Sequence, residues 1–267
     1  MALFNKTMAL FNKITAMLCF FTTFSLCERY FRSEILKYIW NFSHLFVPLQ
    51  PQMKNEMKFK AALFDLDGVV FDTEPQYTVF WGEQCREFHP ERPGLEQEIK
   101  GQTLVQIYDA WFSGPLAPQQ AVITERLDRF EQQMSYDYIA GFEDYMAALR
   151  RQGVRTAVVT SSNQPKMQAV YHAHPEFRDL FDAILTSEDF ERSKPDPDCY
   201  LKAAERLGVT KDECVVFEDS FNGLRSGRAA GMYVVGLATT NSAERIVPLC
   251  DRVISDYTLL TQPSFVL

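Results

Sequence analysis

The chain has few of the residues that bind structural zinc or form a disulfide framework. Among 267 residues there are only four histidines and six cysteines. The cysteines are scattered, with no C-x-x-C pair and no histidine at zinc-finger spacing, which argues against a zinc module. We interpret the cysteines as free thiols and expect a reducing compartment, so that a cytoplasmic location is predicted.

A cluster of basic residues is also missing. The formal net charge is -8, with 27 Lys and Arg against 35 Asp and Glu. Binding to a phosphate backbone needs clustered Lys and Arg, so we expect no nucleic-acid partner. A few local cations suffice for a small anion, and a small phosphorylated molecule remains a possible partner of what we expect to be a monomer.

No apolar run reaches the length of a comfortable membrane span. The stretch from Ile14 to Leu26 has the length of a signal-peptide core and follows Lys6 and Lys13, but no small-x-small cleavage site comes after it. We interpret residues 1–57 as an N-terminal extension, either a start-site artefact upstream of Met57 or a signal-like segment. The second reading would mean export; neither predicts stable membrane association.

From Lys58 onward, short apolar runs alternate with segments of helical period. The predicted strands are Phe59–Phe64, Val154–Val159, Ala183–Leu185, Cys214–Phe217, Tyr233–Leu237 and Arg252–Ser255. The predicted helices are Tyr145–Gln152, Pro165–His172, Asp198–Leu207 and Asn222–Ala230. This alternation predicts an α/β fold, a Rossmann-like parallel sheet with helices on both faces.

One stretch breaks the alternation. Residues 73–138 have helical character, several prolines and no strand-like run, which predicts a helical insertion after the first strand. We therefore expect a catalytic α/β core formed by residues 58–72 and 139–267, with residues 73–138 as a small cap domain. Asp72 and Thr73 precede Glu74-Pro75, and we interpret them as a helix N-terminus.

Acidic side chains follow the first predicted strand. Asp65 and Asp67 flank one residue, so that in an extended segment they point to the same side. Phosphoryl transfer has use for such a pair, because one carboxylate attacks phosphorus and the other serves as acid to the leaving oxygen and later as base to water. Acidic residues before a glycine also shape turns, so the pair alone is weak evidence.

Polar residues follow other predicted strands too, at the carboxyl ends where parallel sheets have their reactive crevice. In order and approximate spacing, four segments resemble the four motifs of the haloacid dehalogenase-like superfamily. They are Asp65-Leu66-Asp67-Gly68-Val69, Thr160, Lys194-Pro195 and Glu218-Asp219-Ser220. The resemblance covers roughly residues 58 to 260. It implies that Asp65 is the nucleophile, forming an aspartyl-phosphate, and that Asp67 is the general acid/base.

The resemblance also implies a Mg²⁺ site and a phosphate site. Asp65, the backbone carbonyl of Asp67 and Asp219 would bind Mg²⁺, with Glu218 binding it directly or through water. Thr160 would hold the transferring phosphoryl group. Lys194 would reduce the repulsion between the carboxylates and would stabilise the negative charge that develops on the phosphoryl oxygens.

Three further residues are candidates for substrate contact. Ser161 and Asn163 follow the second motif, where similar proteins reach the substrate phosphate. Thr160 could instead be the N-cap of the next helix, and a cap at Ser161 or Ser162 would be compatible with its phosphate-binding role. Lys100 in the insertion could meet an anionic substrate, and an exposed lysine at a helix end is an equally good reading.

The insertion resembles the cap of the branch that includes β-phosphoglucomutases, phosphoglycolate phosphatases and sugar-phosphate phosphatases. Mutases of this branch keep a cap histidine and a cap arginine, and this sequence has Tyr77 and Leu104 at those places. We therefore predict a Mg²⁺-dependent phosphatase acting on a small phosphorylated metabolite such as a sugar phosphate. The alternatives are a β-phosphoglucomutase-like hexose-phosphate mutase and, from another class, a binding protein that has lost catalysis.

Overall fold

The computed structural model describes residues 59–260, all of which lie within one compact unit. The predicted N-terminal extension, residues 1–57, lies outside the described residues. Within them, Cys85, Cys199, Cys214 and Cys250 are free thiols. None of the described helices is both long and apolar enough to cross a membrane.

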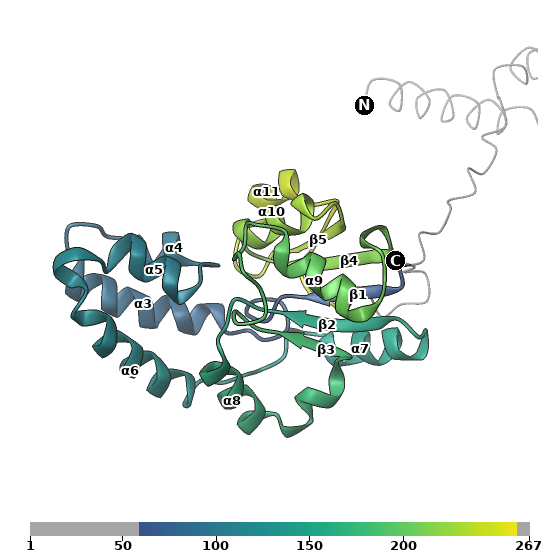
Figure 1. Ribbon diagram of the computed structural model, residues 1–267, viewed down its shortest axis with the longest axis horizontal. Coiled ribbons are helices and arrows are strands. Elements are labelled where there is room, and N and C mark those ends of the chain that lie inside the picture. The colour runs from purple at the N-terminus through teal and green to yellow at the C-terminus, as the bar shows by residue number, and fades with distance from the viewer. Residues whose placement is uncertain (1–58, 261–267) are drawn as a thin grey trace, which may run out of the picture. The chain divides into compact units, whose positions relative to one another are not determined.

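Six strands form one parallel sheet in the order β3-β2-β1-β4-β5-β6 (Figure 1). The strands are β1 (Ala61–Phe64), β2 (Arg155–Val159), β3 (Ala183–Leu185), β4 (Cys214–Glu218), β5 (Tyr233–Leu237) and β6 (Arg252–Ile254). In the central strand, Ala62 pairs with Thr156 on one side and with Val215 on the other. The predicted parallel α/β sheet is confirmed.

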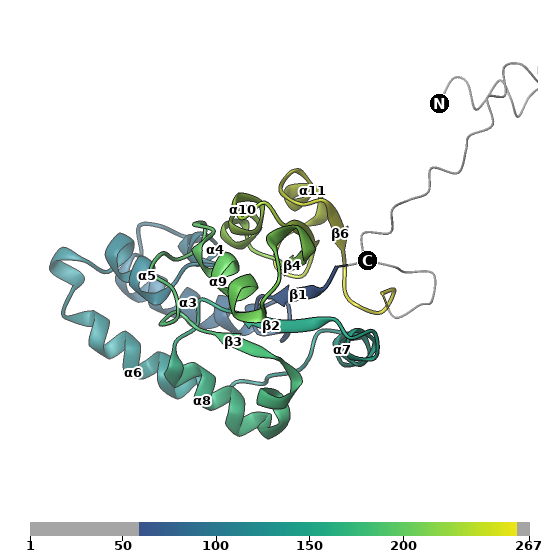
Figure 2. The ribbon, with the colours of Figure 1, turned by 45° about the vertical axis from the view of Figure 1, so that its right-hand side comes forward.

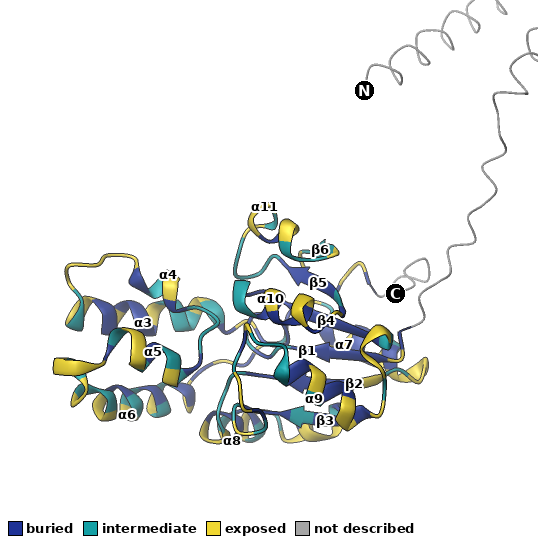
Figure 3. Ribbon diagram, turned by 45° about the horizontal axis from the view of Figure 1, so that its top comes forward, coloured by how far each residue is buried: buried dark blue, intermediate teal, exposed yellow. Residues whose placement is uncertain are grey.

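Helices cover both faces of this sheet, which explains why its central strands are mostly apolar. Helices α7 (Phe142–Arg151) and α8 (Gln164–Ala173) pack with Phe64 and Phe217 in one buried cluster. On the other face, Leu63 and Val216 pack with α9 (Asp198–Leu207), α10 (Phe221–Ala229) and α11 (Ala243–Ile246). The central strands β1 and β4 accordingly lie dark blue between the helices in Figure 3.

Three predicted helix starts differ from the structure, and one of them, at α10, differs by a single residue, Phe221 in place of Asn222. Helix α7 begins at Phe142, three residues before the predicted Tyr145, because Gly141 with φ 78° allows the chain to turn into the helix there. Helix α8 begins at Gln164, and its cap is Asn163, whose side chain accepts a hydrogen bond from the backbone N–H of Lys166. The alternative reading of Thr160 as the cap was therefore wrong, and neither Ser161 nor Ser162 is the cap.

Four helices follow β1 and precede α7, and we call them the cap helices. They are α3 (Glu74–Phe88), α4 (Leu95–Ile99), α5 (Leu104–Trp111) and α6 (Gln119–Glu131). They bury an apolar cluster of their own, which includes Phe80, Trp81, Phe112 and Ile123. Figure 2 shows them beyond the carboxyl end of β1. The helical insertion after the first strand was predicted. That it forms a separate cap domain stays a prediction.

Candidate active site

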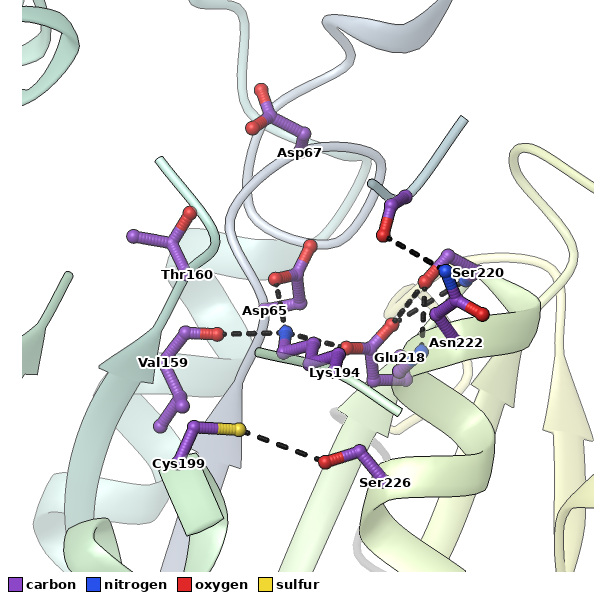
Figure 4. Close-up of polar contacts among 12 residues, drawn as sticks. Asp65, Asp67, Val159, Thr160, Lys194, Cys199, Glu218, Ser220, Asn222 and Ser226 are labelled. Atoms are coloured by element: carbon purple, nitrogen blue, oxygen red, sulfur yellow. Dashed lines mark hydrogen bonds and ion pairs between the residues drawn. The ribbon is translucent and has the colours of Figure 1, made fainter. Parts of the chain in front are cut away.

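Lys194 lies at the centre of a buried charged cluster at the carboxyl end of the sheet (Figure 4). Its Nζ lies 2.6 Å from Asp65 Oδ1 and 2.6 Å from Glu218 Oε1. The same nitrogen donates to the backbone carbonyl of Val159 at 2.9 Å. The ammonium group therefore has three acceptors, which satisfies a cation that is only 2% exposed.

Mutual stabilisation of opposite charges sets the protonation of this cluster. Burial by itself lowers the pKa of Lys194, but the carboxylates of Asp65 and Glu218 raise it above its ordinary value. Burial raises the pKa of Asp65 to about 7, although Lys194 acts in the opposite direction. Glu218 and Asp67 raise it further, so an added cation would favour the ionised nucleophile.

Glu218 is fully buried, and protein donors surround both of its carboxylate oxygens. Oε1 accepts from Lys194 and, at 2.7 Å, from the hydroxyl of Tyr200. Oε2 accepts from the hydroxyl of Ser220 at 3.2 Å. A Cβ on Gly223 would lie 1.7 Å from Oε1, so the carboxylate occupies the place that a larger side chain there would need.

Asp219 completes a set of oxygen ligands. Asp65, Glu218 and Asp219 each offer a carboxylate oxygen, and these oxygens all lie within 4.8 Å of one another. Burial raises the pKa of Asp219, and the nearby Glu74 is the next largest cause. Carboxylate oxygens are the ligands that Mg²⁺ prefers, and a bound dication would relieve the repulsion among these acids. The cluster fits a magnesium ion.

Asp67 does not hydrogen-bond to Asp65 in the described part of the chain. Its Oδ1 accepts from the Thr73 hydroxyl at 2.5 Å, and its Oδ2 accepts from the Ser162 hydroxyl at 3.3 Å. Lys166 forms an ion pair with Oδ2. The side chain of Thr73 makes no capping bond to α3, so the purely structural role predicted for Thr73 was incomplete.

The residues after β2 form the side of the site where a phosphoryl group is expected. Thr160 is 1% exposed, and its Oγ1 accepts from the backbone N–H of Ser162 at 3.0 Å. Ser161 and Asn163 lie in the same loop and face the same cavity. The loop therefore offers hydroxyl and amide groups beside Asp65.

A cavity of about 550 Å³ joins this cluster to the cap helices. Every predicted site residue except Glu218 lines it, namely Asp65, Asp67, Lys100, Thr160, Ser161, Asn163, Lys194 and Asp219. The structure thus brings together residues that the sequence separates by more than 150 positions. A cavity of this size suits a small metabolite.

Two carboxylates, on the side of the cavity that the cap helices form, were not predicted from the sequence. We call this side the cap wall and the side formed by the sheet ends the core wall. Glu131 accepts a hydrogen bond from the hydroxyl of Tyr77 at 2.8 Å, and burial raises its pKa to about 7. Glu74 Oε2 is buried and has no hydrogen-bond partner among the described residues; Lys100 Nζ lies 4.0 Å away. The pKa of Glu74 is likewise raised to about 7, mainly by burial.

The cap helices contact the core at the rim of the cavity. The Gln106 side chain donates to the backbone carbonyl of Lys194 at 3.2 Å. Gly101 has φ 71°, and a Cβ there would lie 2.6 Å from the Cβ of Ser220. Such a close approach requires glycine at this position.

Comparisons with known proteins identify the family of the chain. A model of the haloacid dehalogenase-like hydrolase family matches residues 59–231. The chain belongs to this family. The predicted family and the predicted enzyme class, a hydrolase, are confirmed.

Two curated relatives from Escherichia coli are named as phosphatases. Hexitol phosphatase A is 30% identical over 221 residues, covering 78% of this chain and 97% of the relative. Fructose-1-phosphate phosphatase YqaB is 27% identical over 194 residues, covering 67% of this chain and 96% of the relative. The matched region spans nearly the whole length of both relatives.

Solved structures show the same fold. CbbY from Rhodobacter sphaeroides, in complex with phosphate, aligns with a TM-score of 0.63 and 25% identity, covering 78% of this chain and 99% of that chain. A β-phosphoglucomutase from Clostridium difficile aligns with a TM-score of 0.63 at 19% identity, covering 76% of this chain and 93% of that chain. The likeness to the mutase concerns the fold alone.

Proposed function

We propose that this hydrolase is a Mg²⁺-dependent phosphatase that releases phosphate from a small phosphorylated metabolite, such as a sugar phosphate, through an aspartyl-phosphate intermediate. One observation carries the proposal. Asp65 is held by Lys194 beside Asp219, at the bottom of a cavity that the cap helices cover.

The two aspartates after β1 divide the chemistry. An oxygen of Asp65 forms a bond to phosphorus while the bond from phosphorus to the leaving oxygen breaks, and Asp67 gives that oxygen a proton. In the second step, Asp67 takes a proton from water, whose oxygen attacks the aspartyl-phosphate and regenerates Asp65. The ester and water thus yield an alcohol and phosphate.

The carboxylates of Asp65 and Asp219, with the backbone carbonyl of Asp67, would hold Mg²⁺. When bound, the ion neutralises charge on the phosphoryl oxygens. Glu218 suits a different role, because both of its oxygens already accept hydrogen bonds within the protein. It fixes Lys194, and direct binding of the metal by Glu218 would compete with these bonds.

Phosphate contacts would come from the loop after β2 and from Lys194. Thr160, Ser161 and Lys194 line the cavity beside Asp65. Asn163 uses its side-chain oxygen to cap α8, which leaves its amide nitrogen for an acceptor on the substrate.

The cap wall favours a substrate rich in hydroxyl groups. Glu74 and Glu131 present carboxylates to the cavity, and carboxylates accept hydrogen bonds from hydroxyls but repel a second anion. Lys100 is near enough to moderate this repulsion only at Glu74. The names of the two Escherichia coli relatives, which refer to hexitol and fructose 1-phosphate, fit such a substrate.

Hydrolysis is better supported than transfer to a sugar hydroxyl. Tyr77 stands where the mutases keep a histidine, and its hydroxyl is already bonded to Glu131. An ordinary phenol is also a weak base near neutral pH. Since Tyr77 offers no basic group in place of that histidine, water is the acceptor that we propose.

A panel of sugar and polyol monophosphates tests the proposal. Phosphate release should require Mg²⁺, should be abolished by a chelator, and should fall by roughly 10⁴-fold or more in Asp65→Asn, since the attacking atom is lost. Equal activity of wild type and Asp65→Asn would refute the role of Asp65. Interconversion of sugar phosphates primed by a bisphosphate, without phosphate release, would establish the mutase instead.

A further inference from the structure

Lys166 is a buried cation in a place where a helix does not favour one. It is the third residue of α8, in the first turn, where the helix dipole favours negative charge. The residue is only 3% exposed, and lysines are rarely buried to this extent without a partner. Its retention inside the protein therefore needs a specific acceptor.

That acceptor is the predicted general acid. Lys166 Nζ forms an ion pair with Oδ2 of Asp67. The other side chains bonded to this carboxylate, Thr73 and Ser162, are neutral hydroxyls. Among the described residues, Lys166 is thus the charged donor that fixes which way the Asp67 carboxylate faces.

The ammonium group also meets a side chain of the cap helices. Lys166 Nζ lies 4.6 Å from the centre of the Tyr77 ring, within the range of a cation–π contact. Tyr77 lies in α3, and its hydroxyl donates to Glu131 at the end of α6. A core lysine therefore lies between the acid of the core and an aromatic side chain of the cap.

We propose that Lys166 is a positioning residue, which holds the Asp67 carboxylate for proton transfer and is itself held in place by the ring of Tyr77. The inference rests on the proposed phosphatase activity. It assigns to α8 and to the cap a part in orienting the acid. It also gives Tyr77 a role, since its ring steadies the lysine from the cap side.

Esters with different leaving groups separate this role from a merely structural one. An alkyl phosphate loses an alkoxide oxygen that needs the proton of Asp67, whereas p-nitrophenyl phosphate loses a stable phenolate that needs none. The value of kcat/KM reports the steps up to cleavage of the ester bond. A misplaced acid should therefore slow the alkyl ester more than the aryl ester.

The first experiment compares Lys166→Met with wild type on both esters in the full chain with Mg²⁺. We expect kcat/KM to fall roughly 10- to 100-fold for the alkyl ester, part of the effect of a general acid, and less than about threefold for p-nitrophenyl phosphate. Lys166→Arg, which keeps the charge, should recover part of the loss. Lys202→Met, at a surface ion pair of α9, is the matched control and should change neither value.

A second pair of variants tests the contribution of the cap without touching the lysine. Tyr77→Phe keeps the aromatic ring and should leave the ratio of the two kcat/KM values near that of wild type. Tyr77→Leu removes the ring and should lower the alkyl value selectively, by a smaller factor than Lys166→Met does.

Other results overturn the inference. Equal losses on both esters in Lys166→Met would mean that the residue serves phosphate binding or folding, and no loss on either would mean that Asp67 needs no such partner. Either result leaves the phosphatase proposal standing, because wild type remains active. Failure of wild type to hydrolyse both esters would instead refute the phosphatase proposal and this inference together.

Discussion

The two walls of the cavity treat buried charge differently. In the core wall, Asp65 and Glu218 each lie 2.6 Å from Lys194, so the chain supplies its own countercharge. In the cap wall, the carboxylate of Glu131 has a neutral tyrosine as its hydrogen-bond donor, and Glu74 Oε2 has none among the described residues. The core thus holds a fixed cation between two of its acids, whereas the cap leaves Glu74 Oε2 facing the cavity.

This difference suggests separate roles for the two walls, phosphoryl transfer for the core wall and choice of substrate for the cap wall. A preorganised set of charges serves any phosphate ester that reaches it, because the transferring group is the same. The unsatisfied Glu74 Oε2 in the cap instead favours a substrate that brings a donor and penalises one that does not. If the proposed function holds, the core side of the cavity carries out the phosphoryl transfer and the cap side selects the substrate.

Removing the core countercharge should have the largest effect. Lys194→Met leaves Asp65 and Glu218 buried without their cation, and loss of one partner of such a buried pair costs about 3–5 kcal/mol in the free energy of unfolding. Urea denaturation would measure this loss, and phosphatase activity should disappear with it. Lys202→Met should change the free energy of unfolding by less than about 0.5 kcal/mol. An equally small change in the free energy of unfolding for Lys194→Met would contradict the view that the core wall depends on its countercharge.

The buried carboxylate of Glu131 in the cap wall should make the free energy of unfolding depend on pH. The pKa of Glu131 is raised from 4.5 to about 7 in the folded protein, so the folded state binds more protons than the unfolded state between these values. Wild-type stability should therefore fall as pH rises through this window. Glu131→Gln should remove up to about 3 kcal/mol of that fall, which makes the variant relatively more stable at pH 8 than at pH 5.

Urea denaturation at the two pH values checks the contribution of Glu131. The matched control is Glu125→Gln, an exposed residue of the same helix, which should leave the pH dependence unchanged. Identical curves for wild type and Glu131→Gln would show that the cap carboxylate is not desolvated in the way the structure indicates.

The contact between the walls offers a smaller and sharper test. Gly101 and Gly94 both have positive φ, so alanine at either should cost about 1 kcal/mol of stability. Only at Gly101 does the new Cβ meet Ser220, while nothing lies within 4 Å at Gly94. Gly101→Ala should therefore lower kcat/KM roughly tenfold by displacing the cap, and Gly94→Ala should not. Equal kinetics in the two variants would argue that the fit of cap to core is unimportant.

The sheet could be predicted closely because its strands are buried on both faces. Ala183–Leu185 and Tyr233–Leu237 were predicted with the bounds that the structure has, and helix Asp198–Leu207 likewise. Apolar runs between glycine or polar breaks carry this information locally. The start of α7 could not be read in the same way, because Gly141 resembles any loop glycine until its backbone angles are known.

The residues of the candidate site also differ in how well the sequence predicts them. Asp65, Asp67, Lys194 and Asp219 stand at strand ends and in motifs, so sequence order was enough to propose them. Glu131 and Lys166 sit within helices, where charged residues are ordinarily solvated, and only their burial distinguishes them. For Lys166 one local signal did exist, a cation in the first turn of a helix, but it was too weak to weigh without the structure.

The closeness of Glu218 and Gly223 has a consequence for how this site can change over time. A methyl group at position 223 would overlap the carboxylate, so alanine can enter there only if the Glu218 side chain leaves its partners Lys194 and Tyr200. Aspartate at 218, shorter by one methylene, would make room for the methyl group but would draw the acid away from Lys194. We therefore expect Gly223→Ala to lower activity beside glutamate, and aspartate at 218 to restore only part of it, so that neither position can change independently of the other.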